Sequence, residues 1–109
     1  MIQPTETFKD NLSLLPSIET LARIELSDPD GNPVASIENQ PGKQGSLVVY
    51  QYLFQEFGVI DAKAATHGLA VFAEHTIDAK ARPGAHPNID HLLAIIEGGK
   101  PLSVKLIPA

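Results

Sequence analysis

Hydrophobic and polar residues follow two different periods along the chain, and each period predicts one kind of element. Leu21 to Ser27 and Val34 to Asn39 alternate at every second residue, which is typical of half-buried strands. The turn formers from Asp28 to Asn32 lie between them and predict a β-hairpin. Leu102 to Ile107 alternates in the same way and predicts a last strand.

Other segments repeat apolar residues at helical spacing and carry helix start or stop signals. Pro16 ends the first of them, and Gly58, Gly68 and Gly98 follow the other three. The predicted helices are Thr5–Leu15, Ser46–Phe57, Asp61–His67 and Pro87–Ile96. A strand is the competing interpretation for Val48 to Tyr52, because valine and tyrosine favour extended chain.

The segment from Leu69 to His75 fits two structures. As a helix it would continue the preceding one, with Leu69 and Phe72 on a shared face. The segment is also a near-continuous apolar run, which is typical of a strand that is covered on both faces. Gly68 fits a helix end better than a helix middle, so the sequence favours a strand, followed by a loop from Thr76 to Pro87.

These elements predict one globular domain, residues 1–109, of the α/β class with α+β-like features. Two βα crossovers would place the last three strands parallel, and the hairpin would add the first strand as an antiparallel edge. The expected fold is a mixed four-stranded sheet packed with three to four helices. Its carboxyl edge would bring together the loops Gln40–Ser46 and Thr76–Pro87, where open α/β folds usually bind ligands.

Composition narrows the function classes. The absence of cysteine excludes disulfides, thiolate metal sites and a cysteine nucleophile. The formal net charge is −5 and the eight Lys and Arg residues are scattered, which argues against nucleic-acid binding. No apolar run approaches the roughly 20 residues that span a bilayer. The N-terminus resembles no secretory signal, so we expect a cytoplasmic protein that does not bind membranes.

The first candidate site is a histidine pair. His75 would end the third strand and His86 would precede the last helix, so both would lie at one sheet edge. Imidazole suits acid–base work and metal binding, with Asp78 as a third metal ligand and Glu74 as a poorer one. His91 falls away from the inward stripe of its helix, towards solvent. In the competing interpretation both histidines are structural, and no catalytic residue can be assigned beyond these two candidates.

The second candidate is an anion site at a helix start. Free backbone N–H groups there attract phosphate or carboxylate, and a lysine would add charge. The candidate residues are Gly42, Lys43, Gly45 and Ser46. They do not form the G-x-x-x-x-G-K-[ST] loop of nucleotide-binding proteins. Turns between strand and helix also use glycine and serine for conformational reasons alone.

The third candidate is self-association. The aromatic residues Tyr50, Tyr52, Phe54 and Phe57 crowd one predicted helix, and we expect a small core to leave some of them exposed as a dimer surface. Core filling is the competing interpretation. Nucleophilic catalysis by serine finds no support, because no G-x-S-x-G elbow is present.

Three stretches carry a resemblance to a known family: LPSIETLARIEL with DPDGNPVASIENQPGKQGSLVVY, GLAVFAEHT, and RPGAHPNIDHLL. Together they resemble a small bacterial family that is known only as a domain of unknown function. The resemblance covers nearly the whole chain and implies a cytosolic bacterial protein without catalytic residues to carry over. The sequence therefore predicts a non-catalytic binding or accessory domain, a homodimer with no cofactor. The alternatives are a small enzyme, with a divalent metal or with histidine acid–base chemistry, and an anion binder.

Overall fold

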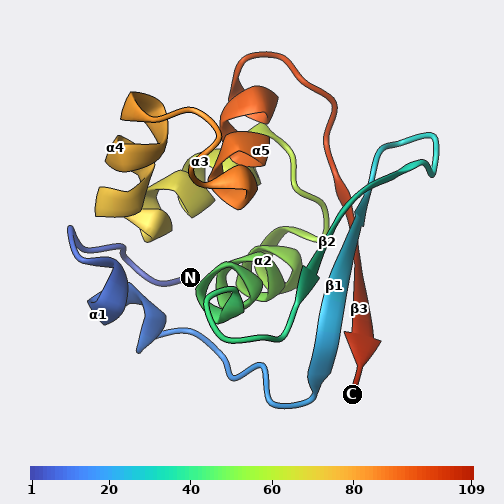
Figure 1. Cartoon of the computed structure of the whole chain (residues 1–109), viewed down its shortest axis with the longest axis horizontal. Helices are drawn as coiled ribbons and strands as arrows, with labels where there is room; N and C mark the ends of the chain where they lie inside the picture. Colours follow the sequence, from blue (N-terminus) through green and yellow to red (C-terminus); the bar gives the residue numbers. More distant parts are fainter.

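The computed structural model describes all residues from 1 to 109 and contains eight elements. They are α1 (Phe8–Leu12), β1 (Leu21–Ser27), β2 (Pro33–Glu38), α2 (Gln44–Phe57), α3 (Ala62–Phe72), α4 (Glu74–Ala81), α5 (Pro87–Ile96) and β3 (Ser103–Pro108). Figure 1 shows the sheet on one side of the molecule and all the helices on the other. The fold is therefore a two-layer α+β arrangement with one covered sheet face.

The three strands form one antiparallel sheet in the order β2-β1-β3. Ile24 of β1 lies opposite Ile37 of β2 on one side and Leu106 of β3 on the other. Leu26 and Ile24 are almost completely buried, whereas Arg23 and Glu25 point to the opposite face and pair with each other. The predicted hairpin and the predicted last strand are confirmed by this register.

The prediction of a mixed four-stranded sheet is wrong, because Leu69 to His75 is helical. Its first part belongs to α3 and its last residues to α4. Gly68 lies inside α3 and serves close packing: a Cβ atom there would stand 2.7 Å from Leu53 and 2.9 Å from Leu92. The chain breaks instead at Ala73, which adopts a positive φ of 53° between α3 and α4.

The loss of that strand changes the rest of the topology. β3 pairs with β1 and runs antiparallel to it, so no strand crosses over in parallel. The predicted loop from Thr76 to Pro87 is helical as far as Ala81, and α1 is shorter than the predicted helix from Thr5 to Leu15. The common carboxyl edge on which both loops were expected to meet does not exist.

The core lies between the sheet and α2, α3 and α5. It contains 19 buried apolar residues, and the rings of Tyr50 and Tyr52 are among them at 0% and 3% exposure. The Tyr50 hydroxyl donates a hydrogen bond to the backbone oxygen of Asn88, which ties α2 to the start of α5. The aromatic residues of α2 therefore fill the core or its margin, and none of them forms an exposed stripe.

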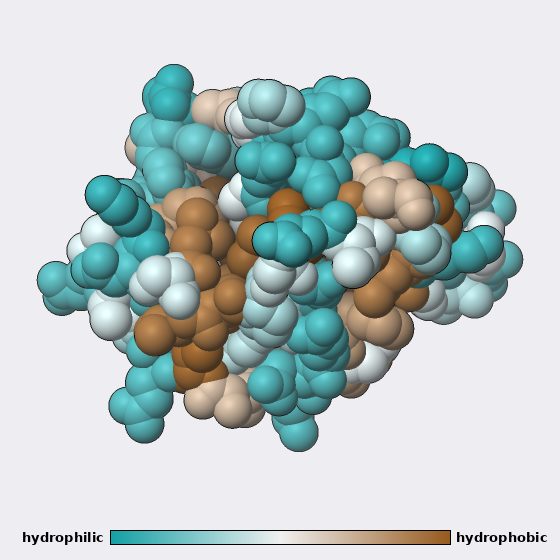
Figure 2. Space-filling model, turned by 90° about the horizontal axis from the view of Figure 1, so that it is seen from below, coloured by the Kyte–Doolittle hydropathy of each residue, from teal (hydrophilic) through white to brown (hydrophobic).

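The N-terminal segment is attached by a buried polar side chain. The Asn11 amide nitrogen donates to the backbone oxygen of Val71 at 3.0 Å, and its Oδ1 accepts the Thr5 N–H at 2.7 Å. Beyond α1 the chain runs along the lower side of the molecule, where Leu14 is 56% exposed. Figure 2 shows this face from below, with hydrophobic residues gathered on its left part among polar ones.

Candidate functional site

A cleft of about 520 Å³ opens between β2, the start of α2, the junction of α3 with α4, and the start of α5. We call it the main cleft. Residues 35–37 form one wall and residues 85–89 the opposite one. With Phe8 of α1, five segments that are far apart in the sequence meet around one space, and six of the sixteen residues that line it are apolar.

All four candidate anion-binding residues line the main cleft. Gly42 and Lys43 precede α2, and Gly45 and Ser46 belong to its first turn. No side chain caps this helix, so its first N–H groups lack a partner from a cap residue. Gly45 also has a packing role, because a Cβ atom there would stand 3.1 Å from the Phe8 ring.

The structure also brings together His75 and His86, by a different route from the one expected. His75 lies in the first turn of α4, and His86 directly precedes α5. Their ring centroids are 5.7 Å apart, and both rings line the main cleft. The His75 and Phe8 rings are nearly perpendicular at a centroid distance of 5.0 Å, and Phe8 stacks on Phe72.

Asp78 holds the ring of His86 from outside the cleft. Its Oδ2 lies 2.6 Å from Nε2 of His86, and its two oxygens also accept hydrogen bonds from Arg82, the residue that follows α4. The hydrogen bonds from Arg82 and His86 hold the pKa of Asp78 well below its usual range. Because this carboxylate can only accept, the His86 proton resides on Nε2 and its Nδ1 is left to face other groups.

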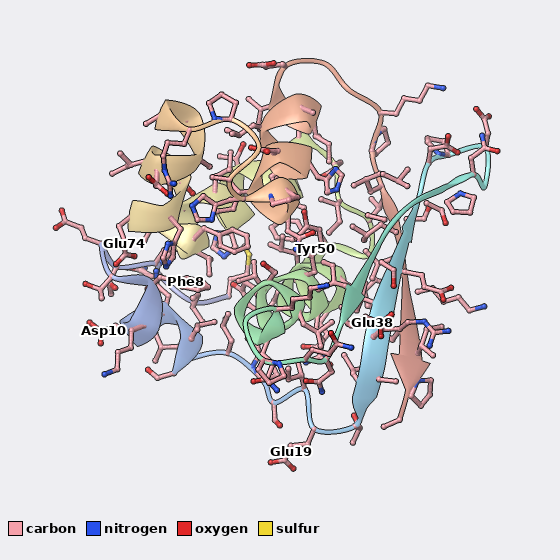
Figure 3. The ribbon with its side chains drawn as sticks, in the orientation of Figure 1. Phe8, Asp10, Glu19, Glu38, Tyr50 and Glu74 are labelled. Atoms are coloured by element: carbon pink, nitrogen blue, oxygen red, sulfur yellow. The ribbon has the colours of Figure 1, made fainter.

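Two other predicted residues take different positions. Glu74 does not line the main cleft: its Oε1 accepts the Phe8 backbone N–H at 2.7 Å, and Figure 3 shows the two residues side by side at the start of α1. His91 was expected to face solvent, but it is partly buried and lines the cleft together with the other two imidazoles. His91 therefore lies off the buried stripe of α5, as expected, on a flank of the helix that borders the cleft.

The ionisable side chains that line the main cleft are all basic. Lys43 is the only formally charged residue in it, and three imidazoles accompany it: His75, His86 and His91. No aspartate or glutamate lines the cleft, although the chain as a whole carries a net charge of −5. No buried side-chain nitrogen or oxygen lacks a hydrogen-bond partner, so the imidazole nitrogens that have no partner are open to solvent.

The structure contains no group of three or more histidine, cysteine, aspartate or glutamate side chains that could hold a metal ion. The predicted set of His75, His86 and Asp78 comes close together, but Asp78 binds the imidazole itself. Metal binding at this place stays a prediction.

Several lining residues could not be identified from sequence. Phe8 and Phe72 add an aromatic wall, and Ile37 and Ile89 add apolar surface between the polar groups. Phe8 and Ile37 lie in elements that gave no chemical signal. Pro87 at the first helical position did mark the start of α5, and two helix starts, one beside a histidine and one beside Lys43, were the signals that pointed here.

Comparison with known protein families gives one match. A family model described as "Uncharacterized protein conserved in bacteria (DUF2322)" matches residues 8–106. The chain belongs to this family. The resemblance seen in the sequence is thereby confirmed, and it covers every element of the fold from α1 to most of β3.

No curated protein and no solved structure shows significant similarity to the chain. The family itself has no assigned activity. None of the helices is both long and apolar enough to traverse a membrane.

Proposed function

We propose that this protein is a small binding domain whose main cleft takes an anionic ligand. The observation that supports it is the composition of the lining, in which Lys43 and three imidazoles meet without any carboxylate. In an acidic chain, such a cleft attracts negative charge locally while the rest of the surface repels it.

Three polar groups of the cleft would each contact the ligand in a different way. Lys43 supplies a mobile positive charge at the mouth of the cleft, since its side chain forms no ion pair and the residue is exposed. His86 is fixed through Nε2 by Asp78, so a protonated ring offers Nδ1–H in one orientation. The uncapped start of α2 adds backbone N–H groups on the side of Gly45 and Ser46.

Titration calorimetry with inorganic phosphate and with acetate tests this proposal. Replacing Lys43→Gln should weaken the binding by about tenfold, because a charge-assisted hydrogen bond contributes roughly 1.5 kcal/mol. Lys63→Gln is the matched control: it removes the same charge from an exposed position on α3 outside the cleft. Absence of saturable binding, or an equal effect of both substitutions, would contradict the proposal.

A second candidate function is acid–base chemistry at His86. The Asp78 carboxylate at 2.6 Å orients the imidazole, as in other carboxylate–histidine pairs. The open Nδ1 would then be the atom that accepts or donates a proton. Neither of the two serine hydroxyls that line the cleft, Ser36 and Ser46, forms a hydrogen bond with His86, so we place this function second to binding.

Self-association stays a prediction. The aromatic residues that suggested a dimer lie in the core or at its margin, so they give it no support. Light scattering at high protein concentration tests it directly, and a mass near 11.7 kDa would contradict a dimer.

A further inference from the structure

The rings of Phe8, His75 and His86 follow one another along the main cleft, and we call these three residues the ring row. The centroids of the first two rings are 5.0 Å apart, and those of the last two are 5.7 Å apart. All three residues line the cleft and each is partly exposed. The ring row therefore offers aromatic surface to a molecule in the cleft.

The ring row connects the two walls that carry the polar groups. At one end, a Cβ atom on Gly45 would stand 3.1 Å from the Phe8 ring, so this ring lies directly against the first turn of α2. Ser46 belongs to the same turn, and Lys43 precedes it. At the other end the row finishes at His86, just before α5. Aromatic surface and the groups that would bind an anion are therefore neighbours.

The Phe8 ring is held in place by the protein itself. It stacks on the ring of Phe72, which is buried, at a centroid distance of 5.3 Å. The backbone N–H of Phe8 donates to Oε1 of Glu74 at 2.7 Å, which fixes the start of α1 against α4. A side chain that is already immobilised loses little conformational freedom when a ligand packs on it.

The main cleft is much larger than a free inorganic anion. Clefts of about 300–1,000 Å³ hold organic ligands of drug size, and this one measures about 520 Å³. An ion between Lys43 and His86 would leave Phe8 and most of this space without a contact. No aspartate or glutamate lines the cleft to pair with a cationic substituent. The ligand that fits has an anionic head and an uncharged organic body.

The groups around the head favour a phosphoryl group over a carboxylate. The Lys43 ammonium and the Ser46 hydroxyl are donors, and a phosphoryl group offers them three terminal oxygens. Asp78 keeps the His86 proton on Nε2, so Nδ1 of the neutral ring can only accept. A phosphate monoester can supply a proton to this acceptor near neutral pH, because its second ionisation has a pKa of about 6. A carboxylate is fully ionised there and has no proton to give.

We propose that the main cleft binds a phosphate monoester whose organic part contains an aromatic ring. This inference rests on the proposed anion binding and names the ligand class. The phosphoryl oxygens contact Lys43, Ser46 and Nδ1 of His86, and the aromatic ring packs on Phe8 and His75. An aryl phosphate and a nucleoside monophosphate share this chemistry, and both serve as probes below.

Titration calorimetry on the full chain compares four ligands: phenyl phosphate, cyclohexyl phosphate, benzoate and inorganic phosphate. Phenyl phosphate should bind about tenfold more tightly than inorganic phosphate, because its body buries apolar surface on the ring row. Cyclohexyl phosphate has the same charge and a similar size but no aromatic ring, so it should bind about three- to tenfold more weakly than phenyl phosphate. Benzoate keeps the ring and should bind at least about tenfold more weakly than phenyl phosphate.

Phe8→Leu is the matching variant, with Phe54→Leu as its control. Phe54 is a partly exposed aromatic residue of α2 that does not line the cleft. Phe8→Leu should abolish the preference for phenyl over cyclohexyl phosphate and leave the affinity for inorganic phosphate unchanged, whereas Phe54→Leu should preserve both. A thermal melt verifies that Phe8→Leu is folded, and the four ligands test the proposal on the unmodified protein without it.

Backbone amide spectra of ¹⁵N-labelled protein locate the bound ligand. Phenyl phosphate should shift the signals of Gly45, Ser46 and His86, and shifts confined to other parts of the chain overturn the proposal. Adenosine monophosphate distinguishes the two sources of this chemistry. Tighter binding than that of phenyl phosphate supports a nucleotide, and weaker binding at the same residues supports an aryl ester.

The remaining outcomes separate this inference from the proposed function. Inorganic phosphate that binds as tightly as phenyl phosphate overturns the aromatic ligand and leaves the anion-binding function standing. Equal binding of phenyl and cyclohexyl phosphate overturns the role of the aromatic ring, and equal binding of benzoate overturns the role of the phosphoryl group. Failure of all four ligands to bind overturns both proposals.

Discussion

His67 and His86 each lie 2.6 Å from one partner atom, yet their surroundings are opposite. His67 meets the hydroxyl of Tyr52, and its ring lies 5.5 Å from the Tyr52 ring and 5.9 Å from that of Phe57. His86 meets the carboxylate of Asp78 and faces the main cleft. One imidazole has a neutral partner and aromatic neighbours, and the other has a charged partner and an open side.

The difference separates a structural imidazole from a functional candidate. Burial lowers the pKa of His67 and raises that of the Tyr52 hydroxyl, so both groups are held neutral. Tyr52 also accepts the Ile2 N–H, which leaves its proton free to be donated to His67. The Nδ1 atom of His86 faces the main cleft, which Lys43 and His75 also line. A positive charge on these groups would attract an anionic ligand. The partner's charge and the open nitrogen therefore distinguish the two residues.

The largest effect is expected on stability from His67→Ala. Tyr52 is a core residue whose partly buried hydroxyl would lose its acceptor, and the ring contacts with Phe57 would be lost as well. We expect the free energy of unfolding to fall by about 1–3 kcal/mol. Urea denaturation measures it, and His86→Ala is the control that should fall by less. A larger loss in His86→Ala would reverse the assignment of the two roles.

The pH dependence of stability gives a second, smaller effect. Because the pKa of His67 is lowered in the folded state, the unfolded chain takes up a proton that the folded chain does not. This contribution to stability is fully present above the ordinary histidine pKa of about 6.5, and it is lost as the pH falls below that value. Tm should therefore decrease between pH 7 and pH 5, and His67→Phe should flatten the slope. Equal slopes in both proteins would argue against a neutral, buried His67.

The sequence predicted the elements that local patterns determine. The hairpin of β1 and β2 follows from alternation and from the turn at Asp28–Asn32, whose side chains and backbone bond one another. The segment after Gly68 was misassigned because glycine was taken as a helix end. Glycine occupies position 68 because a larger side chain would clash with Leu53 and Leu92, which are distant in the sequence. No local pattern reveals a close approach of that kind.

The candidate site was predicted in parts that only the fold unites. The loop at Lys43 and the histidines at 75 and 86 were separate candidates, and they prove to line one cleft. They meet because the first turn of α4, the start of α5 and the start of α2 all border the same cleft, whereas the sequence argument used a sheet edge that does not exist. His91 and Phe8 were missed because their role depends on which flank of a helix faces the cleft.

The smallest effect is expected from Asp78→Ala, which tests what the carboxylate does for His86. Without Asp78 the ring is no longer held with its proton on Nε2, so both tautomers become populated. Long-range ¹H–¹⁵N spectra of the imidazoles measure the tautomer directly, and phosphate affinity should fall roughly twofold, since exposed ion pairs contribute little. Asp90→Ala is the matched control: it removes a carboxylate that accepts the Gly84 N–H and forms no bond with an imidazole. If both variants leave His86 in one tautomer, Asp78 does not orient the ring, and the distinction between His67 and His86 rests on burial alone.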